Sequence, residues 1–156
     1  MSELFSEPDI EVIARHIDEW LAAYRQSHEV VVDAGRDPEA PRRWFMRMHG
    51  EEKEFTTIWL TLGQRTLRYE TYVMPAPEEN AEQLYEQALR RNAKLTGAHF
   101  SIGVENALFL RGELPITVLS EIEIDRVIGT LFAAVETHFP VLIRIGFASR
   151  FAEECQ

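Results

Sequence analysis

The acids, histidines and single cysteine of this sequence could carry chemistry, but their spacing favours none of the common catalytic sites. Glu70, flanked on one strand face by Arg68 and Tyr72, is the one carboxylate placed as an acid-base site would place it. An ion pair between neighbouring strands explains the same arrangement more simply. We therefore predict no catalytic residues, and an enzyme that uses Glu70 with Tyr72 remains a third alternative.

Metal, nucleotide and nucleophile sites are also not indicated by the sequence. Cys155 is the only cysteine and lies one residue from the end, so an exposed tail thiol is expected. There is no phosphate-binding glycine loop with a lysine and no Gly-x-Ser-x-Gly. We predict no metal and no cofactor, because no pair at ligand spacing exists among the five histidines: His16, His28, His49, His99 and His138.

The charged and aromatic residues in the middle of the chain must be positioned by three consecutive strands. Trp44 to His49, Phe55 to Leu62 and Thr66 to Met74 are rich in β-branched and aromatic residues. The turn-prone connections between them are short, which predicts an antiparallel meander.

Alternation along these strands divides the side chains between two faces. The face expected to meet the core carries Trp44, Met46, Met48, Ile58, Leu60, Leu62, Leu67, Tyr69 and Val73. The second face carries Phe45, Arg47, His49, Phe55, Thr57, Trp59, Thr61, Arg68, Glu70, Tyr72 and Met74.

This second face mixes aromatic and charged side chains, a mixture that is common where proteins bind partners. The residues that we predict to bind a partner are Phe45, Arg47, Phe55, Trp59, Arg68, Glu70 and Tyr72. Partial cover of this face by a helix or tail of the same chain is an equal alternative.

The rest of the chain completes an α+β plan. Apolar periodicity predicts helices over about 8–24, 77–95 and 121–139, and a second strand pair over 98–104 and 107–113. The connection 26–42 is less regular: it contains Val30 to Val32 as a short strand, while Gly35, Pro38 and Pro41 are expected to break any longer element. The apolar tail from Pro140 is expected to dock. The predicted order is α-β-β-β-α-β-β-α with an antiparallel sheet of about five strands.

Length and composition predict one soluble domain over residues 1–156. Hydrophobic residues make up 46% and charged residues 27% of the chain, as in folded proteins. A net charge of −10 opposes nucleic-acid binding and favours a basic partner segment. No apolar run reaches the about 20 residues that span a bilayer, and Met1 to Glu11 lacks a signal-peptide pattern. We expect no membrane association and a cytoplasmic location.

Four stretches of the sequence resemble the YbjN-like proteins, which are labelled bacterial sensory transduction regulators. They are W-F-M-R-M-H-G-E-E-K from Trp44, T-x-W-L-T-L-x-Q-R-T-L-x-Y-E-T-Y-V-M-P-A-P-E-E-N from Thr57, L-R-R-N-A-K-L from Leu89 and R-I-G-F-A-S-R-F from Arg144. The resemblance covers about Trp44 to Phe151. It implies the fold of type III secretion chaperones, small α+β proteins that commonly dimerise and hold an extended partner polypeptide. It supplies no catalytic residues.

The leading hypothesis is a non-enzymatic protein-binding module that acts as a regulator or chaperone-like adaptor. The partner would bind the mixed aromatic face, or add to an exposed sheet edge. The alternative is a small-molecule-sensing domain with a pocket between sheet and helices. The fold resemblance and the narrow apolar stripe of the helix at 77–95 also predict a homodimer.

Overall fold

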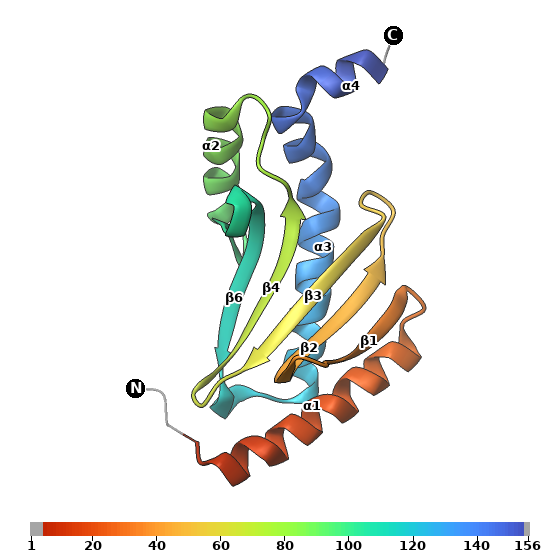
Figure 1. Cartoon of the computed structure of the whole chain (residues 1–156), viewed down its shortest axis with the longest axis vertical. Helices are drawn as coiled ribbons and strands as arrows, with labels where there is room; N and C mark the ends of the chain where they lie inside the picture. Colours follow the sequence, from red (N-terminus) through yellow and green to blue (C-terminus); the bar gives the residue numbers. More distant parts are fainter. Residues whose placement is uncertain (1–4, 155–156) are drawn as a thin grey trace.

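A six-stranded antiparallel sheet is the frame of the computed structural model, which describes residues 5–154 (Figure 1). Its spatial order is β1-β2-β3-β4-β6-β5. The strands are β1 (Val31–Asp37), β2 (Ala40–His49), β3 (Phe55–Leu62), β4 (Thr66–Met74), β5 (His99–Ile102) and β6 (Leu108–Pro115). The predicted α+β class and the meander of β2, β3 and β4 are confirmed. Cys155, expected to be an exposed tail thiol, lies outside the described residues.

The expected count of about five strands was one too low, because β1 is longer than predicted and pairs with β2 over most of its length, with two register shifts. Gly35 does not end the strand but pairs with Phe45 in the ladder. Pro38 lies in the turn between the two strands, where a missing N–H is harmless, and Pro41 lies near the start of β2.

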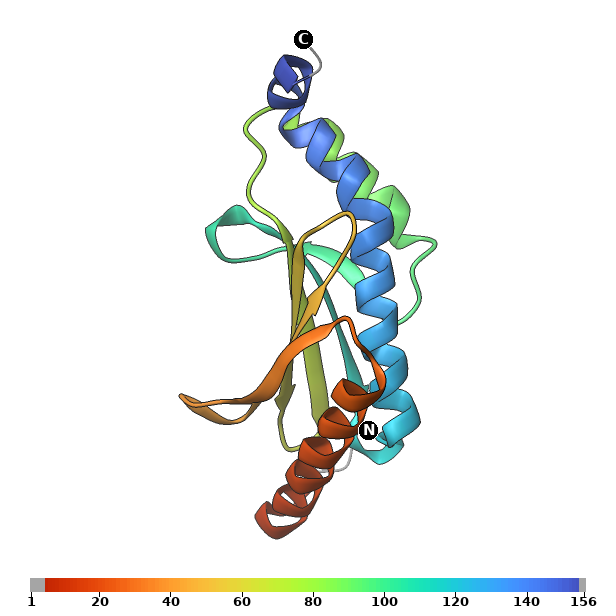
Figure 2. The same ribbon diagram turned by 90° about the vertical axis from the view of Figure 1, so that its right-hand side faces the viewer.

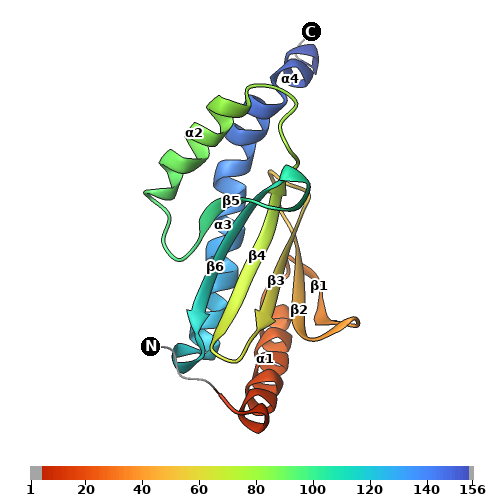
Figure 3. The same ribbon diagram turned by 60° about the vertical axis from the view of Figure 1, so that its left-hand side comes forward.

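The helices lie on one side of the sheet, and Figure 2 shows this arrangement edge-on. They are α1 (Glu7–Ser27), α2 (Ala81–Asn92), α3 (Glu121–Gly146) and α4 (Ala148–Glu154). Figure 3 shows α2 beside α3. Two short 3-10 turns, Val104–Asn106 and Ile116–Val118, flank β6.

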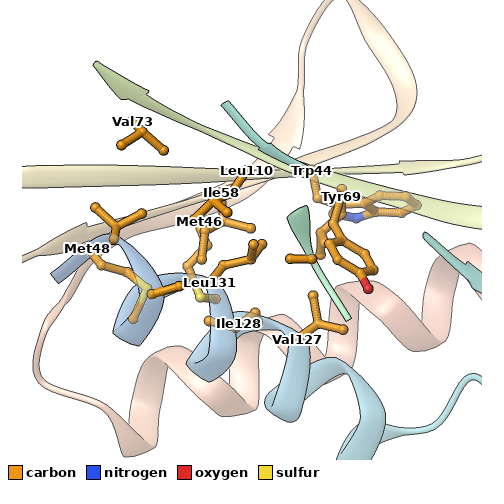
Figure 4. Close-up of a cluster of buried hydrophobic side chains, with 14 of the residues drawn as sticks. Trp44, Met46, Met48, Ile58, Tyr69, Val73, Leu110, Val127, Ile128 and Leu131 are labelled. Atoms are coloured by element: carbon orange, nitrogen blue, oxygen red, sulfur yellow. The ribbon is translucent and has the colours of Figure 1, made fainter. Parts of the chain in front are cut away.

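The core forms between the apolar face of the sheet and α3, as the alternation predicted. All nine residues expected on this face are buried, each exposing 4% or less of its surface. Figure 4 shows sheet residues such as Met46 and Ile58 against Ile128 and Leu131 of α3. Burial of such side chains contributes roughly 1.5–3 kcal/mol each.

Helix α1 is attached to the sheet by an ion pair as well as by apolar packing. Asp18 accepts hydrogen bonds from Nε1 of Trp44 at 2.7 Å and from Nε of Arg36 at 2.8 Å. The bond from Arg36 is the main reason why the pKa of Asp18 lies below its usual value, although burial opposes it. The carboxylate of Asp18 thus provides a hydrogen-bond acceptor for the N–H of the buried Trp44 ring.

Helix α3 continues through Pro140, although a helix end was expected near Phe139. Leu142 and Gly146 are buried beyond the proline, so tertiary packing outweighs the lost backbone hydrogen bond. The end of α3 packs closely on the connection before α2. A Cβ added at Gly146 would lie only 3.0 Å from Cβ of Pro77. The docking of the tail is confirmed, and up to Gly146 the docked segment belongs to α3. Together with α4 it raises the helix count from three to four.

Helix α2 is shorter than the predicted 77–95. The backbone N–H groups of Glu78 and Glu79 both donate to the carbonyl of Gly146, at 3.0 and 3.1 Å. Asn80 has a left-handed φ of 55°. The N–H groups of Glu78 and Glu79 therefore bond the last carbonyl of α3 instead of starting a helix of their own, and α2 begins only at Ala81.

Met74 was expected on the outward face of the sheet, and this was wrong. The register between β4 and β6 shifts between Tyr72 and Met74, so Val73 and Met74 are both fully buried.

Helix α3 is long and apolar enough by length and composition to cross a membrane, a property shared by core helices of soluble proteins. Ile124, Ile128 and Leu131 of this helix are fully buried against the rest of the chain. Packing within the fold therefore explains part of its hydrophobicity, since 28% of its most apolar stretch is buried.

Candidate functional site

One face of the sheet carries no helix within residues 5–154, and we name it the open face. In Figure 1 it is the side on which the strands lie in front of α3. The structure places all seven predicted partner-binding residues on it, from three adjacent strands. They are Phe45 and Arg47 of β2, Phe55 and Trp59 of β3, and Arg68, Glu70 and Tyr72 of β4.

Strand register joins these side chains into a row across the sheet. Phe45 pairs with Trp59, Trp59 with Glu70, and Glu70 with Arg111 of β6. Sequence reasoning missed Arg43, Phe109, Arg111 and Glu113, which also lie on the open face. Alternation within β6 could have placed the last three on a common face. Only the sheet order puts β6 next to β4.

Each of four aromatic rings on the open face has a basic group over it. The guanidinium carbon of Arg43 lies 4.0 Å from the ring centre of Trp59, and that of Arg47 lies 4.0 Å from Phe55. The two further pairs are Arg111 over Phe109 at 4.7 Å and Lys53 over Tyr72 at 4.9 Å. A cation over a ring is attracted by the ring's electron density, so these basic groups are held in place.

Glu70 is held between two arginines. Its Oε2 accepts a hydrogen bond from Nε of Arg111 at 2.8 Å, and its Oε1 lies 3.8 Å from a terminal nitrogen of Arg43. The interpretation of Glu70 as a cross-strand ion pair is confirmed. These contacts give Glu70 a structural role in linking β4 to β2 and β6.

Lys53, in the connection between β2 and β3, lies at the end of the sheet between Tyr72 of β4 and Phe139 of α3. Its Nζ donates a hydrogen bond to the carbonyl of Tyr72 at 2.9 Å and lies 5.8 Å from the ring centre of Phe139. Burial lowers its pKa from 10.5 to about 8. Burial, assisted by the negative charge of Glu105, raises the pKa of Tyr72.

The edges of the sheet are less available than its open face. On β5, the side chain of Asn92 accepts a hydrogen bond from the N–H of Phe100 at 2.7 Å and donates to its carbonyl at 3.3 Å. On β1, the side chain of Asp33 accepts from the N–H of Ala34 at 2.9 Å. Side chains that occupy the groups of an edge strand protect it from pairing with another chain.

The open face is hollowed between β4 and β6. This depression has a volume of about 530 Å³ and a largely charged lining that includes Arg68, Glu70, Arg111 and Glu113. Within residues 5–154, no group of three or more histidine, cysteine, aspartate or glutamate side chains is arranged to hold a metal ion.

A separate pocket of about 500 Å³ lies on the helix side of the sheet. Its apolar part includes Leu95, Leu114, Val127 and Leu131, and Lys94, Arg126 and His138 add positive or titratable groups. Burial lowers the pKa of His138, and the positive charge of Arg91 adds to the effect.

The fold matches solved type III secretion chaperones, although sequence identity is low. The ExsC-ExsE complex gives a TM-score of 0.59 at 14% identity, covering 83% of this chain and 95% of that one. The HopA1-SchA chaperone-effector complex gives 0.57 at 12% identity, with 85% and 96% covered. The ExoU-SpcU complex from the type III secretion system of Pseudomonas aeruginosa gives 0.53 at 15% identity, with 81% and 96% covered. This class of fold is what the sequence resemblance implied.

The chain belongs to the YbjN family, described as "Putative bacterial sensory transduction regulator", whose profile matches residues 14–144. It is 31% identical over 117 residues to the uncharacterized protein Rv0487 of Mycobacterium tuberculosis, covering 75% of this chain and 64% of that protein. It is 29% identical over 132 residues to the uncharacterized protein ML2442 of Mycobacterium leprae, covering 85% and 72%. The chain thus spans less than two thirds of the length of Rv0487.

Proposed function

We propose that this chain is a non-enzymatic protein-binding module, a regulator or chaperone-like adaptor that binds a partner polypeptide on the open face. The observation that carries this proposal is the row of aromatic and charged side chains across three adjacent strands, with no helix of residues 5–154 over it. Tyr72 is exposed and Phe45, Phe55 and Trp59 are half-buried, and aromatic residues with arginines are typical of the residues that dominate binding energy at protein interfaces.

The fold supports the same class of function. Solved complexes with this fold include a chaperone bound to its effector. Fold alone does not fix function, so the proposal rests on the side chains of the open face. The occupied edge of β5 favours binding through these side chains over addition of a strand there.

Affinity capture of the tagged chain from its host lysate tests the proposal, with parent and variants compared by mass spectrometry. Trp59→Glu places a charge in the centre of the row, opposite Glu70. Trp59→Thr removes the ring without adding charge and suits a strand. We expect a stoichiometric protein partner with the parent, lost with both variants.

The control is Ile122→Glu, which adds the same charge at an apolar side chain of α3 that is 75% exposed and distant from the open face. Circular dichroism establishes that each variant is folded. A partner retained by both folded Trp59 variants would contradict the proposal.

A second candidate function, small-molecule sensing, is favoured by the pocket on the helix side. Its volume of about 500 Å³ lies within the range of about 300–1,000 Å³ that is usual for ligand sites. Ala133 lines the pocket and is exposed, so Ala133→Phe should narrow it without disturbing the core. A thermal-shift screen of metabolites should find a ligand that stabilises the parent but not this variant. A screen with no stabilising ligand counts against sensing.

A further inference from the structure

On β2, β4 and β6 the charges of the open face differ in sign from those of the molecule as a whole. Four arginines and two glutamates occupy its outward strand positions on β2, β4 and β6: Arg43, Arg47, Arg68, Arg111, Glu70 and Glu113. The complete sequence carries a net charge of −10. These three strands are therefore locally basic on an acidic protein, whereas the edge strand β1 adds Asp33, which pairs with Arg47 in the ladder, and Asp37.

The acids of this surface are already paired. Glu70 is bonded to Arg111, and Oε2 of Glu113 lies 3.7 Å from Nε of Arg68. At the lower end, Asp37 lies 3.5 Å from Arg43. A basic partner would have to compete with these arginines for each carboxylate.

Arg47 has no carboxylate within ion-pair distance among residues 5–154. It is exposed, and its guanidinium carbon is held over the ring of Phe55. The cation is thus positioned by an aromatic anchor, while its N–H groups remain able to donate to an incoming acid. Phe45 and Trp59, whose ring centres are 5.7 Å apart, offer apolar contact on the same surface.

The shape of the molecule leaves this surface accessible to a chain segment. In Figure 2 the turn between β1 and β2 and the connection between β5 and β6 both project on the side opposite α3. The face between these two projections contains the depression of about 530 Å³ lined by Arg68 and Arg111.

We propose that the open face binds an extended acidic polypeptide segment that also carries apolar side chains. Its carboxylates would pair with Arg47 and compete with Glu70 and Glu113 for the arginines around the depression, and its apolar side chains would contact Phe45, Phe55 and Trp59. This inference rests on the proposed function, and it specifies the chemistry of the partner.

A selection from a library of random displayed peptides of about 15 residues, long enough to cross the sheet when extended, tests this inference. Peptides are selected on the parent protein and those that still bind Trp59→Thr are removed. We expect the enriched peptides to be net acidic and to contain aromatic or aliphatic residues. Their affinity should fall steeply between about 50 and 300 mM salt.

The matched variants are Arg47→Glu and Arg15→Glu, which change the net charge equally. Arg15 is exposed on α1, away from the open face. We expect Arg47→Glu to weaken the best acidic peptide about tenfold or more, and Arg15→Glu to change its affinity by less than about threefold. An equal loss in both variants would overturn the inference, since it would reflect the total charge alone.

The selection distinguishes a failure of the acidic-partner inference from a failure of the proposed protein-binding function. Enriched peptides that need Trp59 but are neutral or basic would overturn the acidic partner and leave the protein-binding function standing. A library with no peptide that depends on Trp59 would overturn both.

Discussion

At the scale of residues, the ionisation of Lys53, beside Tyr72 and Phe139, can be measured directly. Its folded pKa is about 8, because burial disfavours the charged ammonium. The unfolded chain keeps the proton up to about pH 10.5, so it binds more protons than the folded chain between these values. The penalty for a buried charge is therefore fully present below pH 8 and is relieved as pH rises.

We predict that the free energy of unfolding of the parent, measured relative to Lys53→Met, rises between about pH 7.5 and 9.5. Urea unfolding of both proteins at several pH values measures this difference. The sequence has two lysines, Lys53 and Lys94, so the Lys53 side-chain resonance is identified by its absence from the variant. A Lys53 resonance that titrates near pH 10.5 would show that the ammonium is solvated.

At the scale of elements, Gly112 allows β4, β6 and the connection before β5 to approach closely. The hydroxyl of Tyr69 donates a hydrogen bond to the carbonyl of Gly97 at 2.5 Å. A Cβ at Gly112 would lie 2.2 Å from that carbonyl oxygen and 2.5 Å from Cε2 of Tyr69. A methyl group there requires backbone movement and not only a rotamer change.

We predict that Gly112→Ala lowers the free energy of unfolding by about 1–3 kcal/mol. Gly129, within α3, is the control, because a Cβ there would meet nothing within 4 Å. Gly129→Ala should instead stabilise the protein by about 0.5–1 kcal/mol, since alanine is the better helix former. Chemical denaturation of both variants measures the two effects. Equal stability of Gly112→Ala and the parent would contradict the packing described.

At the scale of the whole molecule, we propose that the chain forms a homodimer. The exposed apolar side chains of the helices support this, since Leu89 of α2 is 68% exposed and Val141 of α3 is 41% exposed. Light scattering at about 50 µM should give about 36 kDa, twice the chain mass of 18.0 kDa.

Two substitutions on opposite sides of the molecule test where the copies meet. Leu89→Glu should shift the mass towards the monomer, because it places a charge on the exposed side of α2. Trp59→Thr on the open face should leave the mass unchanged. A parent protein that is monomeric at this concentration would exclude the homodimer.

The predicted partner-binding residues show which features of the site can be read from the local sequence pattern. Phe45, Trp59 and Glu70 were placed on one face by alternation alone, because successive strand side chains point to opposite sides. Alternation does not state which strands are neighbours. Arg111 therefore entered the site only through the pairing of β6 with β4, which joins residues 41 positions apart in sequence.

The sequence by itself determined the α+β class, the meander and the residues of the core face, because these follow from periodicities of two and about 3.6 residues within short windows. The tertiary structure alone decided where elements end and what they meet. Helix α3 passes Pro140 because Leu142 and Gly146 find burial beyond it, and Met74 turns inward at a shift in register. Such outcomes depend on contacts between distant segments, whose energies outweigh local propensity.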